Sequence, residues 1–163
     1  MRKSILLFLA VAMIFPAFGA SYKGTFSNLS SYDQDGNLVT SDIFKDYDVT
    51  MINIFATWCN PCLSEMRDIK KLSRTLPENS NLILVCPDGY DNPEDFDFIV
   101  KYFDLDFPVL KMTGKEILSH YNLVAFPTNI FVDREGNIIG VSTGAGNYRK
   151  FLVEIKSMLE KSR

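Results

Sequence analysis

The strongest constraint on how this chain folds is a pair of cysteines, Cys59 and Cys62, at the junction of two sequence patterns. Residues 49–55 before the pair are apolar and favour a buried strand. Residues 61–76 carry apolar side chains at three- and four-residue steps, which predicts an amphipathic helix. The thiols therefore lie at a helix N-terminus, where unpaired N–H groups and the helix dipole favour a thiolate. This context indicates a redox pair rather than half of a zinc site.

The length, charge and cysteine count of the chain limit the classes of protein to which it can belong. A chain of 163 residues has the size of one domain, and its 47% hydrophobic content is typical of a globular protein. The net charge of −3 provides no basic surface, so nucleic acid is not an expected partner. Three cysteines are too few for a disulfide scaffold, and Cys86 is left outside the pair.

The first twenty residues have the pattern of a secretory signal peptide. Arg2 and Lys3 precede an apolar run over 5–15, and small residues at 17–20 follow Pro16. The alternative is an uncleaved membrane anchor, but the run is shorter than the roughly 18–20 residues of a spanning helix. We therefore predict a signal peptide over 1–20 and one domain over 21–163. The expected location is extracytoplasmic, in the periplasm or cell envelope, where stable disulfides form.

The remaining pattern predicts an α/β fold. Turn residues at 33–37, between short segments at 26–29 and 38–39, predict an N-terminal β-hairpin within 21–48. Further strands are expected at 49–55, 81–86, 107–111, 129–133 and 137–143, and helices at 61–76, 92–103, 115–121 and 148–161. A β-α-β unit followed by a late hairpin implies a parallel pair with antiparallel additions. The result is a three-layer fold with a central mixed sheet and helices on both faces.

Three local sequences carry a resemblance to a known family. They are NIFATWCNPCLSEM at 53–66, FPT at 126–128 and IFVDREG at 130–136. In this order they resemble the thioredoxin fold and, within it, the extracytoplasmic thiol-disulfide oxidoreductases of the TlpA/ResA type. The resemblance covers about residues 22–160. It implies a thioredoxin fold, disulfide exchange with other proteins, and neither cofactor nor metal.

The resemblance also implies a role for each cysteine of the pair. Cys59 would attack a partner's disulfide to form a mixed disulfide, and Cys62 would then attack the Cys59 sulfur and release the reduced partner. The pair would thus alternate between a dithiol and a redox-active disulfide. A structural disulfide and a zinc half-site are the alternatives, although no second cysteine or histidine pair exists to complete a zinc site.

The resemblance places four residues in the substrate-binding region, although Phe126 is bulkier than the residue that the family often has before the proline. Pro127 matches a cis-proline beside the two sulfurs, and the backbone of Phe126 would offer a docking edge to an extended substrate. Thr128 follows in the same motif, and Trp58 is expected to shield Cys59 from solvent. The alternative for Pro127 is an ordinary trans proline at the start of a strand.

Glu65 matches an acidic residue that the family carries near the active site. If burial raises its pKa, its carboxylate would take up or return the proton of the resolving thiol. The alternative is a solvated acid in the first helical turn. Asn53 lies where cytoplasmic thioredoxins carry a buried acid, and its amide cannot move a proton. Arg67 replaces a helix-kinking proline of the family, so a straighter helix is expected.

Two other residues bear on alternative functions. Cys86 ends an apolar strand and is expected to be buried and inert, with a regulatory or intermolecular disulfide as the alternative. A Sco-like copper-binding assembly factor needs three residues between its cysteines and a distant histidine. This chain has two between them, and its single histidine, His120, is expected to pack or to lie on the surface. A peroxiredoxin-like peroxidase needs a lone peroxidatic cysteine in another setting.

The spacer Asn60-Pro61 bears on the direction of electron flow. It contains no cation, so the helix terminus is the main stabiliser of the Cys59 thiolate, which favours a reducing couple. By resemblance, the protein would reduce specific protein disulfides, such as those of apocytochrome c during cytochrome c maturation. A membrane electron donor of the thiol-reductase type would recharge it. We expect a monomer.

Overall fold

The computed structural model describes residues 23–162, so the predicted signal peptide over 1–20 lies outside the described residues. Within this part of the chain, no helix is long and apolar enough to cross a membrane. A short 3-10 helix, η1, spans Ser41–Phe44. The strands are β1 (Ser30–Tyr32), β2 (Leu38–Thr40), β3 (Val49–Ile54), β4 (Ser80–Cys86), β5 (Val109–Lys111), β6 (Thr128–Val132) and β7 (Ile138–Thr143). The α-helices are α1 (Asn60–Ser73), α2 (Pro93–Tyr102), α3 (Gly114–His120) and α4 (Tyr148–Lys161).

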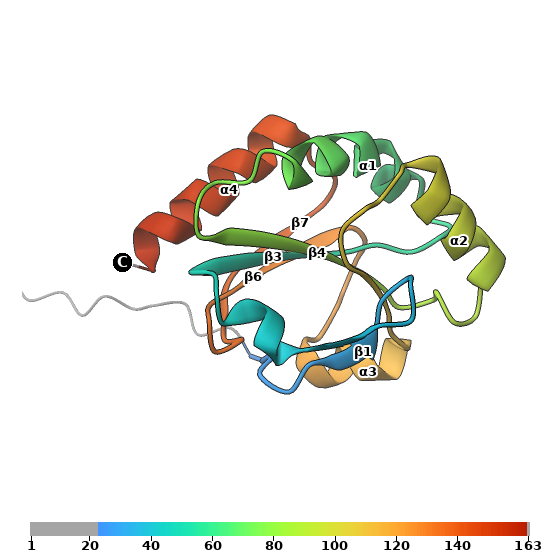
Figure 1. Ribbon diagram of the computed structural model, residues 1–163, viewed down its shortest axis with the longest axis horizontal. Coiled ribbons are helices and arrows are strands. Elements are labelled where there is room, and N and C mark those ends of the chain that lie inside the picture. Colours follow the sequence, from blue (N-terminus) through green and yellow to red (C-terminus); the bar gives the residue numbers. More distant parts are fainter. Residues whose placement is uncertain (1–22, 163) are drawn as a thin grey trace, which may run out of the picture.

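The strands form one mixed sheet in the order β2-β1-β5-β4-β3-β6-β7. At its centre, β3 pairs parallel with β4 and antiparallel with β6. The helices α1, α2 and α4 cover one face of the sheet, and α3 lies against the other (Figure 1). The predicted three-layer α/β arrangement of the thioredoxin fold is therefore confirmed.

Successive side chains of the central strands point to opposite faces of the sheet, so the apolar residues are divided between two cores. Met51 packs with the α1 and α4 layer, while Ile52 and Ile54 face the layer that contains α3. All three are fully buried, and such side chains each contribute roughly 1.5–3 kcal/mol to folding. With both faces covered, β3 is a rigid base for the residues that follow it.

The N-terminal hairpin exists, but its first strand lies later than predicted. Phe26 is fully buried, and its N–H donates to the Gly136 carbonyl at 2.8 Å. The N–H of Leu29 then bonds the Phe26 carbonyl at 3.0 Å, so residues 26–29 form a turn and not a strand. Strand β1 begins at Ser30 and also pairs with β5, which joins the hairpin to the main sheet.

Prolines explain two other differences at element ends. Helix α1 ends at Ser73, short of the predicted 76, because Pro77 disfavours helical geometry at the residue before it and Thr75 turns back onto Leu72. Strand β5 begins at Val109, later than the predicted 107, because Pro108 has no N–H to donate to a neighbouring strand. Exposed Arg67 lies within α1, which runs without interruption from Asn60 to Ser73.

Two turns with the same hydrogen bonds close the N-terminal hairpin and the β6–β7 hairpin. In each, a glycine N–H donates to an aspartate carbonyl, and the glycine has a positive φ of 81° at Gly36 and 80° at Gly136. A side chain at Gly36 would meet nothing within 4 Å, but at Gly136 its Cβ would lie 2.7 Å from the Ser27 nitrogen. The second turn is therefore packed against the backbone of the N-terminal segment.

We predict that alanine at these two glycines has unequal effects. Gly36→Ala should lower the free energy of unfolding by about 1–2 kcal/mol, the cost of left-handed backbone for a residue with a Cβ. Gly136→Ala should lower it by roughly 3 kcal/mol or more, because the segment at Ser27 must also move. Denaturant unfolding of the two variants measures this difference, and equal losses would contradict it.

Candidate active site

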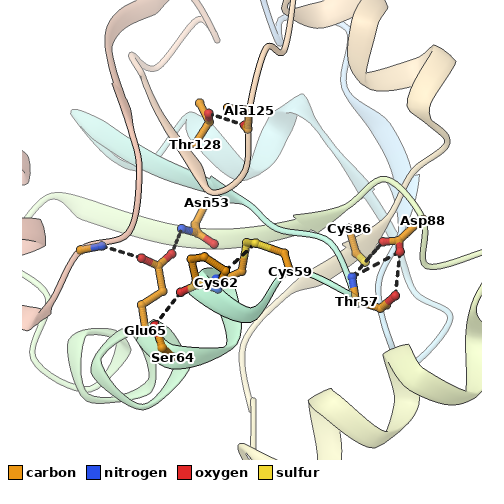
Figure 2. Close-up of a disulfide and its surroundings, with 12 residues drawn as sticks. Asn53, Thr57, Cys59, Cys62, Ser64, Glu65, Cys86, Asp88, Ala125 and Thr128 are labelled. Carbon is orange, nitrogen blue, oxygen red and sulfur yellow. Dashed lines mark hydrogen bonds between the residues drawn. A yellow bond between two sulfur atoms is a disulfide. The ribbon is translucent and has the colours of Figure 1, made fainter.

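Cys59 and Cys62 form a disulfide at the start of α1, with an S–S distance of 2.07 Å (Figure 2). Cys59 is the N-cap residue of the helix, and its sulfur accepts a hydrogen bond from the Cys62 N–H at 3.2 Å. Cys62 is fully buried and Cys59 is 4% exposed. The Cys62 N–H favours a thiolate on Cys59 once the disulfide is reduced.

An apolar groove of about 700 Å³ lies beside Cys59. Its walls include Trp58, Pro61 and Phe126, together with Leu118 from α3. Trp58 is 67% exposed, and its ring meets the Phe126 ring edge-on at 5.6 Å. Cys59 lines the groove and Cys62 does not, and no charged residue of the described chain lines it. Cys59 is therefore the cysteine of the pair that faces this uncharged, apolar groove.

The peptide bond between Phe126 and Pro127 is cis, as the family resemblance predicted. Pro127 is buried, and its carbonyl accepts a hydrogen bond from the Gly144 N–H at 2.9 Å. The Thr128 hydroxyl is turned inward and donates to the Ala125 carbonyl at 2.8 Å. Thr128 therefore shapes the loop, while Phe126 contributes to the groove itself.

Glu65 is 1% exposed, and both of its carboxylate oxygens accept hydrogen bonds. The Asn53 side-chain amide donates to Oε1 at 2.8 Å, and the Gly146 N–H donates to Oε2 at 2.7 Å. Burial raises the pKa of Glu65, and these two hydrogen bonds oppose that rise. The more distant Lys150 also opposes it, and Glu154 adds to it. Glu65 is thus a buried acid beside the redox pair and not a solvated surface acid.

Asn53 connects Glu65 to the strand that follows the cis-proline. Its amide nitrogen donates to Asn129 Oδ1 at 2.7 Å as well as to Glu65. Its buried oxygen has no hydrogen-bond partner among the described residues. Figure 2 shows this oxygen on the disulfide side of the amide, with the nitrogen turned towards Glu65. Sequence reasoning missed Asn129 and Gly146, because only strand pairing and the β7–α4 connection bring them here.

A second carboxylate, Asp88, lies on the other side of the disulfide (Figure 2). It accepts hydrogen bonds from the N–H of Thr57 at 3.1 Å and from the Thr57 hydroxyl at 2.7 Å. The Cys86 sulfur lies 3.1 Å from Asp88 Oδ1. Sequence reasoning missed Asp88, although parallel β3 and β4 end at the same edge of the sheet. That edge is where the residues after both strands meet.

The remaining cysteine and the histidine are both interior packing residues. Cys86 is fully buried, as predicted, and burial raises the pKa of its thiol above the usual range, with Asp88 adding to the rise. His120 is 6% exposed and stacks on Phe26 with ring centroids 4.8 Å apart. Its Nδ1 lies 2.9 Å from the Thr25 carbonyl oxygen. Among residues 23–162, no three His, Cys, Asp or Glu side chains cluster to hold a metal.

Thiol-disulfide exchange requires one accessible sulfur that forms a thiolate and a second thiol close enough to resolve the mixed disulfide. Cys59 lines the groove at a helix N-terminus, and Cys62 is already bonded to it. On this sheet, with a cis-proline in the adjacent loop, the arrangement defines a thiol-disulfide oxidoreductase of the thioredoxin fold.

The chain belongs to the Redoxin family, whose model matches residues 11–156, and its similarity to curated proteins supports the ResA/TlpA type within that family. It is 29% identical over 154 residues to the thiol-disulfide oxidoreductase ResA of Bacillus cereus, covering 85% of this chain and 88% of that protein. ResA of Bacillus subtilis is 25% identical over 151 residues, covering 88% and 83%.

Solved structures show the same fold. The exposed lipoprotein thioredoxin of Streptococcus pneumoniae matches with a TM-score of 0.69 and 22% identity, over 80% of this chain and 98% of that one. A DsbF homologue from Corynebacterium diphtheriae matches with a TM-score of 0.71 and 19% identity, over 94% and 99%.

We predict that Glu65→Gln changes how stability depends on pH. At low pH, Glu65 is protonated in both the folded and the unfolded chain. Above its ordinary pKa of 4.5, the unfolded chain releases this proton first, because burial raises the pKa in the folded chain. The wild type should therefore lose stability relative to Glu65→Gln as the pH rises from 4.5 through the folded pKa.

Unfolding free energies measured between about pH 4 and pH 8 test this difference. The exposed Glu94→Gln in the first turn of α2 is the control for the loss of one negative charge. An identical pH dependence for the two variants would contradict the prediction.

Proposed function

We propose that this protein is exported and reduces specific protein disulfides, with Cys59 as the attacking thiol and Cys62 as the resolving thiol. The observation that carries the proposal is the asymmetry of the pair: Cys59 lines the groove, and Cys62 is fully buried behind it. Only Cys59 is therefore available to a partner's disulfide. The ResA relatives and the signal-peptide pattern over 1–20 support the extracytoplasmic location of a mature domain over 21–163.

The exchange proceeds in two steps. The Cys59 thiolate attacks one sulfur of the partner's disulfide, which forms the mixed disulfide and expels the partner's other sulfur as a thiolate. Cys62 then gives up its proton and attacks the Cys59 sulfur, which releases the partner as a dithiol. The partner gains two electrons, and the oxidation product is the Cys59–Cys62 disulfide.

Glu65 is the proposed acceptor of the Cys62 proton. It begins the helical turn after Cys62, and its raised pKa makes it a stronger base than a solvated carboxylate. The amide of Asn53 lies between Glu65 and the disulfide in Figure 2 and holds the carboxylate in place. Glu65 thus provides the buried group that exchanges a proton, because the neutral amide of Asn53 cannot do so.

The groove is the proposed docking site for the substrate. Trp58 and Phe126 would contact apolar side chains next to the partner's cysteine. Pro127 and the hydrogen bond from Thr128 to the Ala125 carbonyl shape the loop that carries Phe126. The resemblance to ResA-type proteins suggests apocytochrome c in cytochrome c maturation as the substrate. A membrane electron donor of the thiol-reductase type would return the Cys59–Cys62 disulfide to the dithiol, and the protein would act as a monomer.

Replacing the resolving thiol tests the roles of the two cysteines. Cys62→Ala should accumulate mixed disulfides between Cys59 and its substrates, because the second step is blocked. Non-reducing electrophoresis of envelope extracts detects these species, and mass spectrometry identifies the trapped proteins. Cys59→Ala is the matched control and should trap none. Recovery of no mixed disulfide with Cys62→Ala would overturn the exchange role.

The direction of electron flow is tested by the reduction potential of the pair. We expect a value nearer to about −270 mV, as in thioredoxin, than to about −120 mV, as in DsbA. The reason is that no cation of the described chain lines the groove at Cys59 to stabilise the thiolate further. Equilibration with glutathione or dithiothreitol measures the potential, and a value close to that of DsbA would make the protein an oxidant.

A further inference from the structure

Asp88 joins three segments around the active site. Its carboxylate accepts hydrogen bonds from both the backbone and the hydroxyl of Thr57, and it accepts a further one from Asn92 Nδ2 at 3.3 Å. The Cys86 thiol of β4 donates to the same carboxylate at 3.1 Å. Asp88 only accepts hydrogen bonds in these contacts, as an ionised carboxylate does. A negative charge is therefore fixed where β4, the start of α2 and the segment before α1 meet.

The segment that Asp88 holds is the one that presents Cys59. Thr57 is 7% exposed and precedes Cys59 by two residues. The Cys59 N–H donates to the Ala56 carbonyl at 3.1 Å, so residues 56–59 form a tight turn. Fixing Thr57 therefore also fixes the position of the Cys59 sulfur. In Figure 2, Asp88 lies beyond Thr57 on the Cys59 side of the disulfide, opposite Glu65.

The charges near Cys59 act in opposite directions. The N-terminus of α1 and the Cys62 N–H favour a thiolate on Cys59. Asp88 opposes it, because its negative charge, held on Thr57 two residues before Cys59, repels a thiolate there in a partly buried setting. Other ionisable groups around these residues include Glu65 on the far side, Cys86 beside Asp88, and Asp95 of α2, which lines a hollow with Thr57. Lys111 is a cation next to the Asp88 loop, and it pairs with Asp97.

We propose that Asp88 is a positioning residue for the attacking thiol, which fixes the turn over 56–59 and restrains the ionisation of Cys59. This inference rests on the proposed role of Cys59 as the attacking thiol. When ionisation of Cys59 is disfavoured, its sulfur is a poorer leaving group from the disulfide, and the dithiol is easier to oxidise. A reductant requires a dithiol that is easily oxidised. Asp88 also accepts a hydrogen bond from the Cys86 thiol, which keeps this third thiol protonated and out of the exchange reaction.

The test is the reactivity of Cys59 in the purified, reduced protein. Asp88→Asn keeps the size and an acceptor oxygen but removes the charge. It should accelerate alkylation of Cys59 by iodoacetamide at neutral pH by about threefold to tenfold. The rise of the thiolate absorbance at 240 nm during a pH titration should also occur at lower pH. Asp88→Glu, which keeps the charge, should stay close to the wild type. Asp88→Ser is a second uncharged variant if Asp88→Asn does not fold.

Asp91→Asn is the matched control, because it removes the same charge from an exposed position in the same loop. It should leave both readouts unchanged. If the uncharged variants at 88 leave Cys59 reactivity and titration at wild-type values, Asp88 only stabilises the loop and the proposal is wrong. Equal acceleration by Asp91→Asn would also overturn it. The measurement needs no substrate, so its failure is distinct from failure to trap partners with Cys62→Ala.

Discussion

The pairing of β3 with β4 on one side and β6 on the other is the constraint on which the site depends. In register, Ile54 of β3 lies opposite Val85 and Thr128, and Asn53 lies opposite Asn129. Each strand then delivers one component at the same edge. Strand β3 leads to Cys59, β4 leads to Asp88, and β6 begins directly after Pro127. A one-residue slip in either pairing would turn each strand's side chains to the opposite face and separate these groups.

Two carboxylates lie on opposite sides of the disulfide, and their surroundings give them different tasks. Glu65 is deeply buried on the Cys62 side of the disulfide, and its raised pKa suits it to the proposed exchange of a proton. Asp88 is less buried and accepts hydrogen bonds from neighbouring segments, which suits it to holding charge and shape. Environment, more than residue type, separates a proton carrier from a fixed charge.

The sequence allowed the local parts of the site to be predicted, because each depends on a short stretch of chain. The redox pair at a helix N-terminus followed from the local sequence pattern, and the cis-proline followed from the family resemblance of a contiguous motif. The partners of Glu65 at Gly146 and of Thr57 at Asp88 did not, because sequence separations of 81 and 31 residues leave no periodic signal. The strand expected at 26–29 was wrong for a related reason: buried Phe26 bonds the distant turn at Gly136 instead of a neighbouring strand.

Under the proposed function, the position of β6 restricts which proteins can be reduced. Hydrogen bonds to β3 and β7 occupy both sides of this strand, so only the short backbone stretch at Phe126 is left for a partner. The protein can therefore contact only a few residues of a partner, those around the partner's cysteine. Those residues must leave their own fold to reach the groove. Under the proposed role, the protein would select chains by their unfinished state, acting on disulfides in unfolded or extended segments and sparing those packed inside completed domains.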